Sequence, residues 1–585
     1  MNNLTKILSF LLCVCLIFSL SGCKKQGEEA VSSSQNENVS SGNVSSEESP
    51  SDTETAEKEV ETEFAEDWSD NFSEIEEEFD EDFGLSFYSS GEVTIKNGSD
   101  PIQKDFLGFN AIYHAYTFRN DAYNRVHSER TAKAELDAVK KSGISVARTH
   151  YDYTSAWDNH SQSWNFESDD MQALYRWCLE LKSRNIEVHL NYWYAYRDLF
   201  DKYLASDSVN KKDAYVYADG NKVKAFYVEG NMEKTLDNFA IFINATLENL
   251  YAKGCTNVKY LSLSTEPGFS VLGDGKATPE QAAELYAKDF MSYSNAVHRK
   301  LKESGLRSKV KIVGPNEGAR TTPNGYMTKA VYNLDTEGAI DFYSNHSYYT
   351  GSDLIGDSYI FWDEDIKLKL DGLKCGKDNY IYDEYGIFHS GYSDGANWRR
   401  ENGLYGTQIA VQQIACLNNG IRGSYMWTLM DQQWPNSITT NITDYFEDGV
   451  HQWGLLPNYQ INNVPYPGFY AFQLMANYLG VSGSEVYAVD YSKADLSGIY
   501  AAMVKLPDGN ISVAVVNLNY TAAAVKVNFE KALGKTLYRH QFDPDKVYCS
   551  SDAELIPASA KISNCQKTFV DVVPSFGLIV YTSVK

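Results

Sequence analysis

The chain has 585 residues, 43% of them hydrophobic, 14% aromatic and 22% charged, a balance typical of a globular protein with two to four domains. Its formal net charge of −27 makes a nucleic acid an improbable partner, because phosphate binding requires clustered Lys and Arg. The acidic excess is uneven. Residues 24–82 hold 21 Asp and Glu and 3 Lys, so most of the net negative charge lies in this N-terminal segment and not in the folded body.

The first 22 residues have the features of an export signal. Lys6 supplies a positive charge, and residues 7–20 form an apolar run, shorter than the roughly 20 residues that a membrane-spanning helix needs. The ending Leu20-Ser21-Gly22-Cys23 resembles the lipobox of bacterial lipoproteins, in which the cysteine is lipidated and becomes the new N-terminus. We therefore expect an exported protein that lipid on Cys23 tethers to the extracellular face of the cell membrane, its only membrane contact. Plain cleavage and secretion is the alternative.

Residues 23–85 are expected to form a disordered linker between the signal and the folded body. Ser, Asn and Glu dominate this segment and apolar residues are few, so it cannot bury enough surface to offset the entropy of ordering. Its carboxylates repel one another, which favours an extended spacer. The dense acidic run at residues 74–82 is interpreted as solvated charge, because it does not resemble a calcium loop.

Six cysteines follow Cys23, and none has the CxxC or Cys/His spacing that is typical of a zinc site. Cys549 and Cys565 are the pair closest in sequence, and in an exported chain they could be bridged. The other four lie in periodic apolar segments, where buried free thiols are expected, and they are Cys178, Cys255, Cys375 and Cys416.

Residues 86–478 alternate short apolar runs with amphipathic helical patterns, which predicts right-handed βαβ units and a parallel sheet. Eight such units over roughly 370 residues predict a (β/α)8 TIM barrel. A doubly wound sheet is the competing topology, but no glycine-rich phosphate loop follows an early strand. The expected strands are residues 106–110, 145–149, 186–192, 258–263, 310–313, 340–343, 380–383 and 423–427. The expected helices include residues 131–142, 171–185, 236–253, 279–304 and 404–419.

Residues 479–585 change to short runs of alternating residues separated by turn signals such as Asp508-Gly509. This pattern predicts an antiparallel β-sandwich domain of about 100 residues. Its expected strands are residues 500–505, 511–517, 524–529, 536–541 and 577–582. A further strand near Val93 has no place in the barrel, so it is free to return and join this sandwich.

Two glutamates stand at the carboxyl ends of barrel strands, where the catalytic groups of this fold lie. The fourth strand runs into Thr265-Glu266-Pro267 and the seventh into Asp383-Glu384-Tyr385-Gly386. Strands four and seven lie on roughly opposite sides of an eight-stranded barrel, so we expect Glu266 and Glu384 to face each other across its mouth. An ion pair with a neighbouring Arg or Lys is the alternative role for each.

Two opposed carboxylates are what cleavage of a glycosidic bond requires. One is protonated and assists the leaving oxygen, while the other attacks or stabilises the anomeric carbon. A separation of about 5–5.5 Å leads to retention of configuration, and one of about 6.5–9.5 Å to inversion. This chemistry needs neither a metal nor an organic cofactor.

The pattern resembles clan A of the glycoside hydrolases, retaining (β/α)8 enzymes with the acid/base Glu after strand four and the nucleophile Glu after strand seven. Glu266-Pro267 resembles part of the clan's Asn-Glu-Pro, and Glu384-Tyr385-Gly386 resembles its nucleophile segment. The resemblance covers roughly residues 90–585. The opening Gly108-Phe109-Asn110 and the flanking sandwich are similar to families 39, 30, 51 and 5 of the clan.

The same resemblance implies a set of residues around the two glutamates. Arg148, at the end of strand two, matches the arginine that braces the nucleophile, and His150 in the same segment is counted among the substrate-binding residues. His346 and Tyr348 resemble the groups on strand six that hydrogen-bond near the nucleophile. Trp427 resembles the strand-eight tryptophan under the sugar that is cleaved.

Further aromatic residues in the loops after the strands are candidates for stacking on sugar faces, with ordinary packing as their alternative role. Trp193 follows strand three and is counted among the substrate-binding residues. The other candidates are Tyr194, Trp398 and Trp434.

Thr265 departs from the clan's pattern, because the residue before the acid/base is usually an Asn that hydrogen-bonds the sugar's 2-hydroxyl. A Thr hydroxyl can donate or accept but has a shorter reach, which puts this contact and the identity of the sugar in doubt. The expected Asn-Glu pair occurs instead at Asn316-Glu317, after strand five. Glu317 becomes the acid if the strand count is off by one.

Asp383 precedes Glu384, and neighbouring side chains on a strand point to opposite sides. Only one of the two is therefore expected to face the cleft. We take Glu384 as that residue, on the resemblance, and expect Asp383 to meet a helix or the backbone.

From the sequence we therefore expect a retaining glycosidase of β-linked polysaccharides or oligosaccharides. A non-catalytic, carbohydrate-binding surface lipoprotein is the alternative, supported by Thr265. A solute-binding lipoprotein shares the signal and the size, but it would have two α/β lobes instead of an all-β C-terminus. Nothing in the sequence indicates an oligomeric state.

Overall fold

The computed structural model describes residues 89–585 apart from the segments 120–126, 159, 162, 194, 196–198, 201–225, 267–277, 319–324, 350–357, 375, 388–402, 434–449, 452–453, 460–461, 492–497 and 548. The expected signal, Cys23 and the acidic linker lie outside the described residues. So do Tyr194, Cys375, Trp398 and Trp434. No helix within the described residues is both long and apolar enough to cross a membrane.

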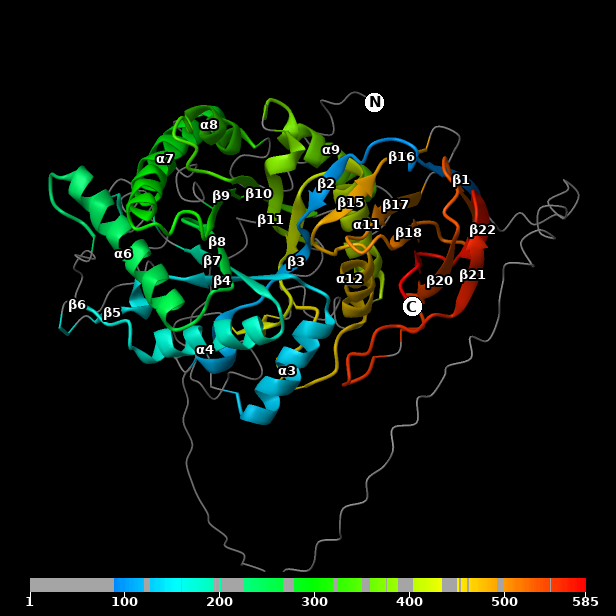
Figure 1. Cartoon of the computed structure of the whole chain (residues 1–585), viewed down its shortest axis with the longest axis horizontal. Coiled ribbons are helices and arrows are strands. Elements are labelled where there is room, and N and C mark those ends of the chain that lie inside the picture. The colour runs from blue at the N-terminus through cyan, green and yellow to red at the C-terminus, as the bar shows by residue number, and fades with distance from the viewer. Residues whose placement is uncertain are drawn as a thin grey trace, which may run out of the picture. The chain divides into compact units, whose positions relative to one another are not determined.

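Eight parallel strands close into a barrel in chain order, which confirms the predicted (β/α)8 fold and excludes the doubly wound sheet (Figure 1). All eight overlap the strands predicted from the sequence. They are β3 (Gly108–Ile112), β4 (Val146–Tyr151), β7 (Glu187–Tyr192), β8 (Val258–Ser262), β9 (Lys311–Glu317), β10 (Phe342–Tyr349), β11 (Tyr380–Ile387) and β12 (Gly423–Met426).

Each barrel strand is followed by a helix. The helices are α3 (Glu129–Lys141), α4 (Asp169–Ser183), α6 (Met232–Ala252), α7 (Pro279–Glu303), α8 (Tyr326–Leu334), α9 (Ser358–Leu370), α11 (Leu404–Asn419) and α12 (Pro467–Tyr478). Local sequence explains where they begin. Before α7, Thr278 and Gln281 form a reciprocal capping box around Pro279 at the first helical position.

Short elements decorate the loops. They are the 3-10 turns η1 (Ala115–Phe118), η2 (Tyr153–Ser155) and η5 (Lys377–Asn379), and the two-residue strands β5 (Trp157–Asp158), β6 (Ser163–Trp164), β13 (Gln432–Gln433) and β14 (Val450–His451). β5 pairs with β6, and β13 pairs with β14.

Apolar side chains from strands all around the barrel meet in its interior and form a closed plug. They are Leu107, Val146, Tyr260, Val313, Phe342, Ile381 and Tyr425. Each lies before its strand or in it, and the polar residues Arg148, Asn316 and Glu384 follow further along their own strands. The plug therefore closes the interior behind the strand ends that carry the candidate site.

The C-terminal domain is a sandwich of two sheets, as predicted, although not every pair is antiparallel. The larger sheet has the order β2-β15-β17-β18-β23-β20-β21 and the smaller β16-β1-β19-β22. Its strands are β1 (Ser89–Ile95), β2 (Gln103–Phe106), β15 (Ser484–Tyr487), β16 (Val489–Asp490), β17 (Ile499–Lys505), β18 (Ile511–Asn517), β19 (Ala523–Phe529), β20 (Lys535–Phe542), β21 (Ala560–Cys565), β22 (Thr568–Val573) and β23 (Leu578–Thr582).

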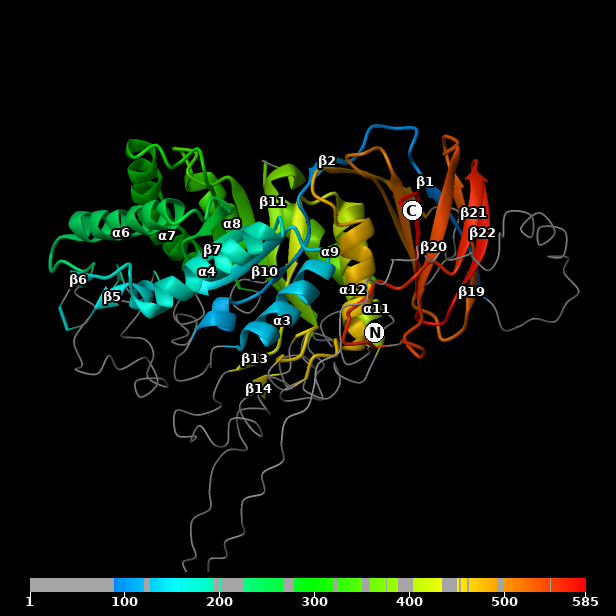
Figure 2. The ribbon, with the colours of Figure 1, turned by 60° about the horizontal axis from the view of Figure 1, so that its bottom comes forward.

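The N-terminal strands belong to this sandwich. β1 runs parallel to β19 over seven residue pairs and antiparallel to β16, so the strand near Val93 does return to it (Figure 2). Val93 and Ile95 pack there with Val513 and Val515 of the opposite sheet. Because β1 and β19 are separated by more than 400 residues, the two ends of the folded body are held together.

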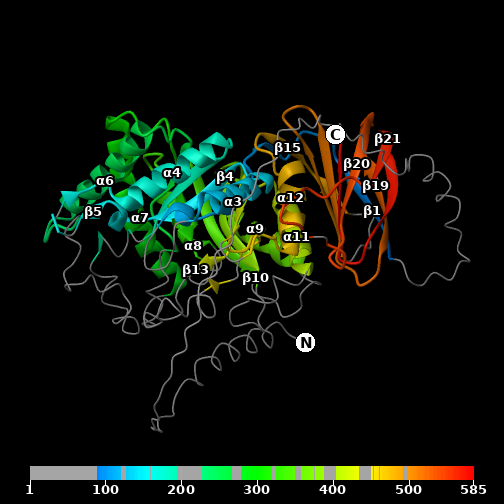
Figure 3. The same cartoon turned by 90° about the horizontal axis from the view of Figure 1, so that it is seen from below.

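Helices α11 and α12 join the barrel to the sandwich, and they lie between the two in all three views (Figure 3). Gly403 precedes α11, and a Cβ there would lie 2.2 Å from the backbone oxygen of Pro544, which follows β20. This close approach requires a glycine. Thr407 of α11 also donates to the backbone oxygen of Phe576, in the turn before β23.

Cys549 and Cys565 are both free thiols, so the bridge suggested for this pair is not formed. Cys178, Cys255 and Cys416 are buried free thiols, as expected from their apolar surroundings.

Candidate active site

The two glutamates at the ends of strands four and seven lie together at the barrel mouth. Glu266 comes shortly after β8, and Glu384 is part of β11. An oxygen of one carboxylate lies within 4.8 Å of an oxygen of the other. The backbone N–H of Glu266 donates to the carbonyl of Asn316 at 3.0 Å, and its φ of 42° is in a region that non-glycine residues rarely adopt. Such strain costs about 1–3 kcal/mol and is typical of functional sites.

Glu384 is held by two donors. Arg148, fully buried on β4, donates from Nη1 to Oε2 at 3.0 Å, and the Tyr348 hydroxyl on β10 donates to Oε1. The ring of Tyr348 reaches this carboxylate across Gly386, where a Cβ would lie 2.6 Å from the ring. Burial raises the pKa of Tyr348 well above its ordinary value, and the charges of Glu384 and Glu266 raise it further. Tyr348 therefore remains a neutral donor to Glu384.

His346 on β10 stands between the two glutamates. Its Nδ1 lies 3.0 Å from Oε1 of Glu266 and 3.5 Å from Oε1 of Glu384. Burial lowers the pKa of His346, while the charges of Glu384 and Asp383 act against that lowering. The imidazole is therefore within reach of both carboxylates.

A buried ion pair on α9 supports His346 from behind. Lys369, 2% exposed, donates to the backbone carbonyl of His346 at 3.1 Å and to Asp365 at 2.9 Å. Asp365 also accepts from the hydroxyls of Ser347 and Tyr382. Strands six and seven are therefore tied to one helix directly behind the candidate site.

The structure corrects the expected orientation of Asp383. Along β10 and β11, Asn345 pairs with Tyr382 and His346 pairs with Glu384, so Asp383 sits in a β-bulge. A bulge interrupts the alternation of side chains, and here Asp383 and Glu384 both point inward. Oδ1 of Asp383 lies 3.7 Å from Nε2 of His346, and burial raises the pKa of Asp383. The expectation that Asp383 meets a helix or the backbone was wrong.

Aromatic rings from strands one, two, three and eight form a wall beside the glutamates. The rings of His150 and Trp193 stack at 4.6 Å, and the ring of Trp427 lies 6.1 Å from His150 and 5.8 Å from His114. Burial lowers the pKa of His150 well below its ordinary value and that of His114 to about 3. Both imidazoles are therefore neutral at pH 7, and the wall is aromatic and uncharged.

Thr265 accepts a hydrogen bond from a residue of strand three. Asn191 on β7 donates from Nδ2 to the Thr265 hydroxyl, and the same nitrogen lies 2.6 Å from Nδ1 of His150. Asn191 was not among the sequence-predicted residues. Its position, one residue before the end of a barrel strand, was the available signal.

Glu317 lies on β9, the fifth strand, and does not face the other two glutamates. Its carboxylate, 1% exposed, accepts from the N–H groups of Met327 and Thr328 at 3.0 and 2.9 Å, from the Thr328 hydroxyl at 2.7 Å and from Asn345 Nδ2 at 2.8 Å. The strand count is therefore not off by one, which removes the ground for taking Glu317 as the acid. Glu317 instead satisfies the first turn of α8, whose preceding residue Gly325 has no side chain to do so.

Asn316, the neighbour of Glu317, sits in a β-bulge, because Ser344 pairs with Pro315 and Asn345 pairs with Glu317. Its Oδ1 accepts from Nη2 of Arg148 at 2.7 Å, so one guanidinium holds both Asn316 and Glu384. The sequence drew attention to this position only as part of a misplaced Asn-Glu pair.

One group of ligand atoms within the described part of the chain is compact enough to hold a metal ion, and it is formed by Glu266, His346 and Glu384. Glu384 already accepts hydrogen bonds from Arg148 and Tyr348, and the guanidinium charge opposes a second cation nearby. This donor set therefore fits hydrogen-bonded carboxylates better than a metal centre.

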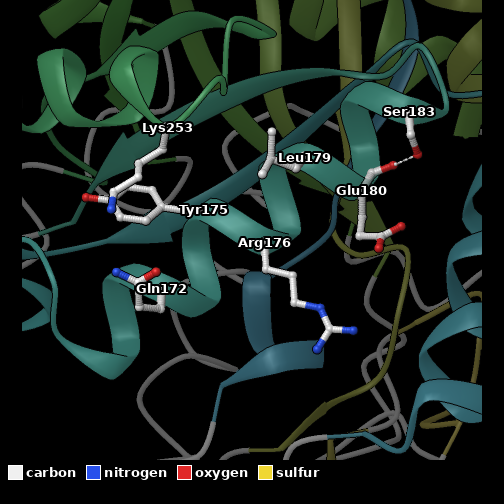
Figure 4. Close-up of a pocket in the computed structure, with 7 residues that line it drawn as sticks. All are labelled: Gln172, Tyr175, Arg176, Leu179, Glu180, Ser183 and Lys253. Carbon is white, nitrogen blue, oxygen red and sulfur yellow. Dashed lines mark hydrogen bonds between the residues drawn. The ribbon is translucent and has the colours of Figure 1, made fainter.

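A separate hollow of about 380 Å³ lies on the outside of the barrel, along one face of α4 and against Lys253 at the end of α6 (Figure 4). Tyr175, Arg176 and Leu179 line it, and Figure 4 shows that these three side chains come from α4. None of the sequence-predicted site residues is among those that line it. The hollow belongs to the helical exterior and not to the carboxyl ends of the strands.

No family model and no curated protein matches the chain, but its fold is similar to solved structures. A GH30 endoxylanase from Clostridium papyrosolvens C71 has a TM-score of 0.52 at 12% identity, over 84% of this chain and 100% of that one. An endo-β1,6-glucanase has a TM-score of 0.52 at 14% identity, over 85% of this chain and 94% of that one. A family 51 α-L-arabinofuranosidase from Bifidobacterium longum has a TM-score of 0.52 at 14% identity, over 84% of this chain and 99% of that one. The chain therefore shares the fold of these three solved structures.

Proposed function

We propose that the chain is a retaining glycoside hydrolase that cleaves β-linked oligosaccharides or polysaccharides by double displacement. The observation that carries the proposal is the pair of carboxylates from strands four and seven, with oxygens within 4.8 Å of each other. This spacing is close to the about 5–5.5 Å of retaining enzymes and shorter than the about 6.5–9.5 Å of inverting ones.

In the first step, Glu384 attacks the anomeric carbon and the glycosidic C–O bond breaks. Arg148 and Tyr348 donate to Glu384 and so hold its carboxylate in position for the attack. Glu266 gives its proton to the departing oxygen. It carries this proton because two carboxylates so close together cannot both ionise without a large electrostatic cost.

In the second step, Glu266, now ionised, takes a proton from a water molecule. The oxygen of that water attacks the anomeric carbon, the bond to Glu384 breaks, and both glutamates return to their starting states. His346 contacts both carboxylates, so it is placed to stabilise the change of charge on each. Two inversions at one carbon give net retention.

The remaining predicted residues have roles in binding the sugar. Trp427 provides an apolar face at the end of strand eight, with His150 and Trp193 beside it. Thr265 stands next to the acid on the partly exposed side of the site. These assignments rest on the positions of the residues around Glu266 and Glu384.

We propose export and lipid anchoring from the sequence alone. The apolar run of residues 7–20 and the ending Leu20-Ser21-Gly22-Cys23 support it. A glycosidase anchored through Cys23 and separated from the membrane by an acidic spacer would reach glycans outside the cell. Metabolic labelling with a radioactive fatty acid, with Cys23→Ser as the control, tests the anchor.

Hydrolysis of a panel of aryl β-glycosides and of plant, fungal and host polysaccharides tests the function. Glu266→Ala and Glu384→Ala are measured beside the unmodified chain, with Glu303→Ala as a control for an exposed glutamate. We expect turnover of at least one member, lost in both site variants and unchanged in the control. Binding of a glycan without turnover would support the carbohydrate-binding lipoprotein instead.

A further inference from the structure

Two buried thiols that lie far apart in the sequence meet in the fold. Cys178 is part of α4, and Cys255 lies in the turn between α6 and β8. Both are fully buried, and a hydrogen bond joins their side chains. The thiol of Cys255 donates to the backbone oxygen of Tyr175 at 3.5 Å, so its sulfur is the acceptor for the proton of Cys178. The two sulfur atoms therefore face each other directly.

The turn that carries Cys255 is fixed against α4 by residues on both sides of it. Lys182, about one turn after Cys178 on α4, donates from Nζ to the backbone oxygen of Gly254 at 2.8 Å. Asn257 donates from Nδ2 to the backbone oxygen of Cys178 at 3.0 Å. These contacts hold the turn and the helix in register, so the approach of the two thiols is a built feature of the barrel.

The two thiols differ in acidity. The hydrogen bond from Cys178 lowers the pKa of Cys255, and the charge of Lys182 adds to this lowering. Burial raises the pKa of Cys178 well above its ordinary value. The thiolate is the nucleophile in exchange between thiols and disulfides. Cys255 is therefore the thiol that reacts first, and Cys178 is placed to react with it.

We propose that Cys178 and Cys255 form a disulfide site, which is oxidised by exchange with the disulfide of a thiol oxidoreductase or of a small thiol. The thiolate of Cys255 attacks one sulfur of that disulfide, and one external thiolate leaves. The thiolate of Cys178 then attacks the sulfur of Cys255, the bridge forms, and the second external thiolate leaves. Two thiols of the chain are oxidised, one external disulfide is reduced to two thiols, and two protons pass to the leaving sulfurs.

This site is on the side of the barrel opposite the two glutamates. The turn between a helix and the next strand lies at the amino end of the barrel, whereas Glu266 and Glu384 lie at the carboxyl ends of their strands. A bridge between Cys178 and Cys255 would tie α4 to the start of strand four and enclose strand three. A cross-link of this kind stabilises mainly by restricting the unfolded chain. We therefore expect it to act on stability and not on chemistry.

The inference goes beyond the proposed function and does not depend on it. Both thiols are reduced in the structure. An exported chain meets disulfides of the kind that the exchange requires, so the site agrees with the export proposed from the sequence. Cys549 and Cys565 were the pair suggested by closeness in sequence, whereas the fold brings Cys178 and Cys255 together instead.

The test maps the bridge by mass spectrometry. The full, reduced chain is incubated with excess oxidised glutathione in urea below the unfolding midpoint, at a concentration where iodoacetamide alone labels both Cys178 and Cys255 through local opening. The remaining thiols are then blocked, and the chain is digested without reduction. Cys416 is the matched control, a buried thiol whose sulfur accepts from Nε2 of Gln412 at 3.0 Å.

We expect two peptides joined through Cys178 and Cys255, while Cys416 carries the blocking group or glutathione. Separate glutathione adducts on Cys178 and Cys255, or two blocked thiols there, would overturn the proposal. So would a bridge from either of them to Cys416.

Thermal unfolding provides a second measurement. The oxidised chain should have a Tm about 5 °C above that of the reduced chain. Cys178→Ala and Cys255→Ala should abolish this difference, and Cys416→Ala should keep it. A difference that persists in Cys178→Ala would contradict the assignment. Hydrolysis of any glycoside should be the same within about twofold in the oxidised and reduced chains, so this inference and the proposed function fail separately.

Discussion

Replacing Glu317 by Ala should destabilise helix α8 and leave the chemistry largely intact, although Glu317 follows an Asn and ends a barrel strand. Its carboxylate accepts from four donors: two first-turn N–H groups of α8, the Thr328 hydroxyl and the Asn345 amide. At about 1 kcal/mol for each buried donor left without a partner, the loss is about 4 kcal/mol. Burial raises the pKa of Glu317, so part of the benefit of its charge is already lost to desolvation, and we use the low end of the range.

Hydrogen exchange followed by mass spectrometry measures this loss locally, which is preferable for a chain with two domains. A loss of about 4 kcal/mol corresponds to about 1000-fold faster exchange in Tyr326–Leu334. Glu303→Ala is the control, since the side chain of Glu303 is 68% exposed in a surface pair with Lys300 and should change stability by less than about 0.5 kcal/mol. Unchanged exchange in α8, together with turnover lost as completely as in Glu266→Ala, would refute the reasoning and make Glu317 the acid.

Three further outcomes are expected. Lys369→Met should lower kcat about tenfold or more at nearly constant KM, because it releases the carbonyl of His346. Lys367→Met, on the exposed side of α9, should change neither kcat nor KM. Equal effects of the two substitutions would show that the buried pair does not position the site. The pKa of Asp383 is raised above its ordinary value of 3.8, so the native state loses stability as pH rises through the raised value. Asp383→Asn should therefore raise Tm at pH 7 but not at pH 4, and an equal shift at both would contradict this. Trp427→Ala should raise KM about tenfold, from the loss of stacking, and an unchanged KM would remove Trp427 from the subsite.

The barrel was predictable because a short apolar run marks each strand, and apolar residues at helical spacing mark most of the helices. The helices that the sequence did not predict are instructive. In α9, Lys367 and Lys369 pair with acidic residues one turn earlier, and one of these pairs is buried, so no apolar stripe marks the helix. In α8, the capping group is Glu317, a residue of the preceding strand, and no local motif signals it.

The part of the site that was predictable consists of residues at the carboxyl ends of barrel strands, because the fold brings these ends together. Glu266, Glu384 and Arg148 come together for this reason. Asp383 was misplaced because a bulge is a property of the pairing between two strands, and the period within one strand does not show it. Asn316 was noticed only as part of a misplaced motif, because its role depends on an arginine 168 residues away.

Trapping of the covalent intermediate is the most direct test of the central claim that Glu384 is the nucleophile of a double displacement. The chain is incubated with activated 2-deoxy-2-fluoro β-glycosides of the sugars that it hydrolyses, and the labelled peptide is identified by mass spectrometry. The account predicts one sugar per chain, attached to Glu384, and no label in Glu384→Ala. A label on Glu266, Glu317 or Asp383, or turnover with inversion and no trapped sugar, would contradict it.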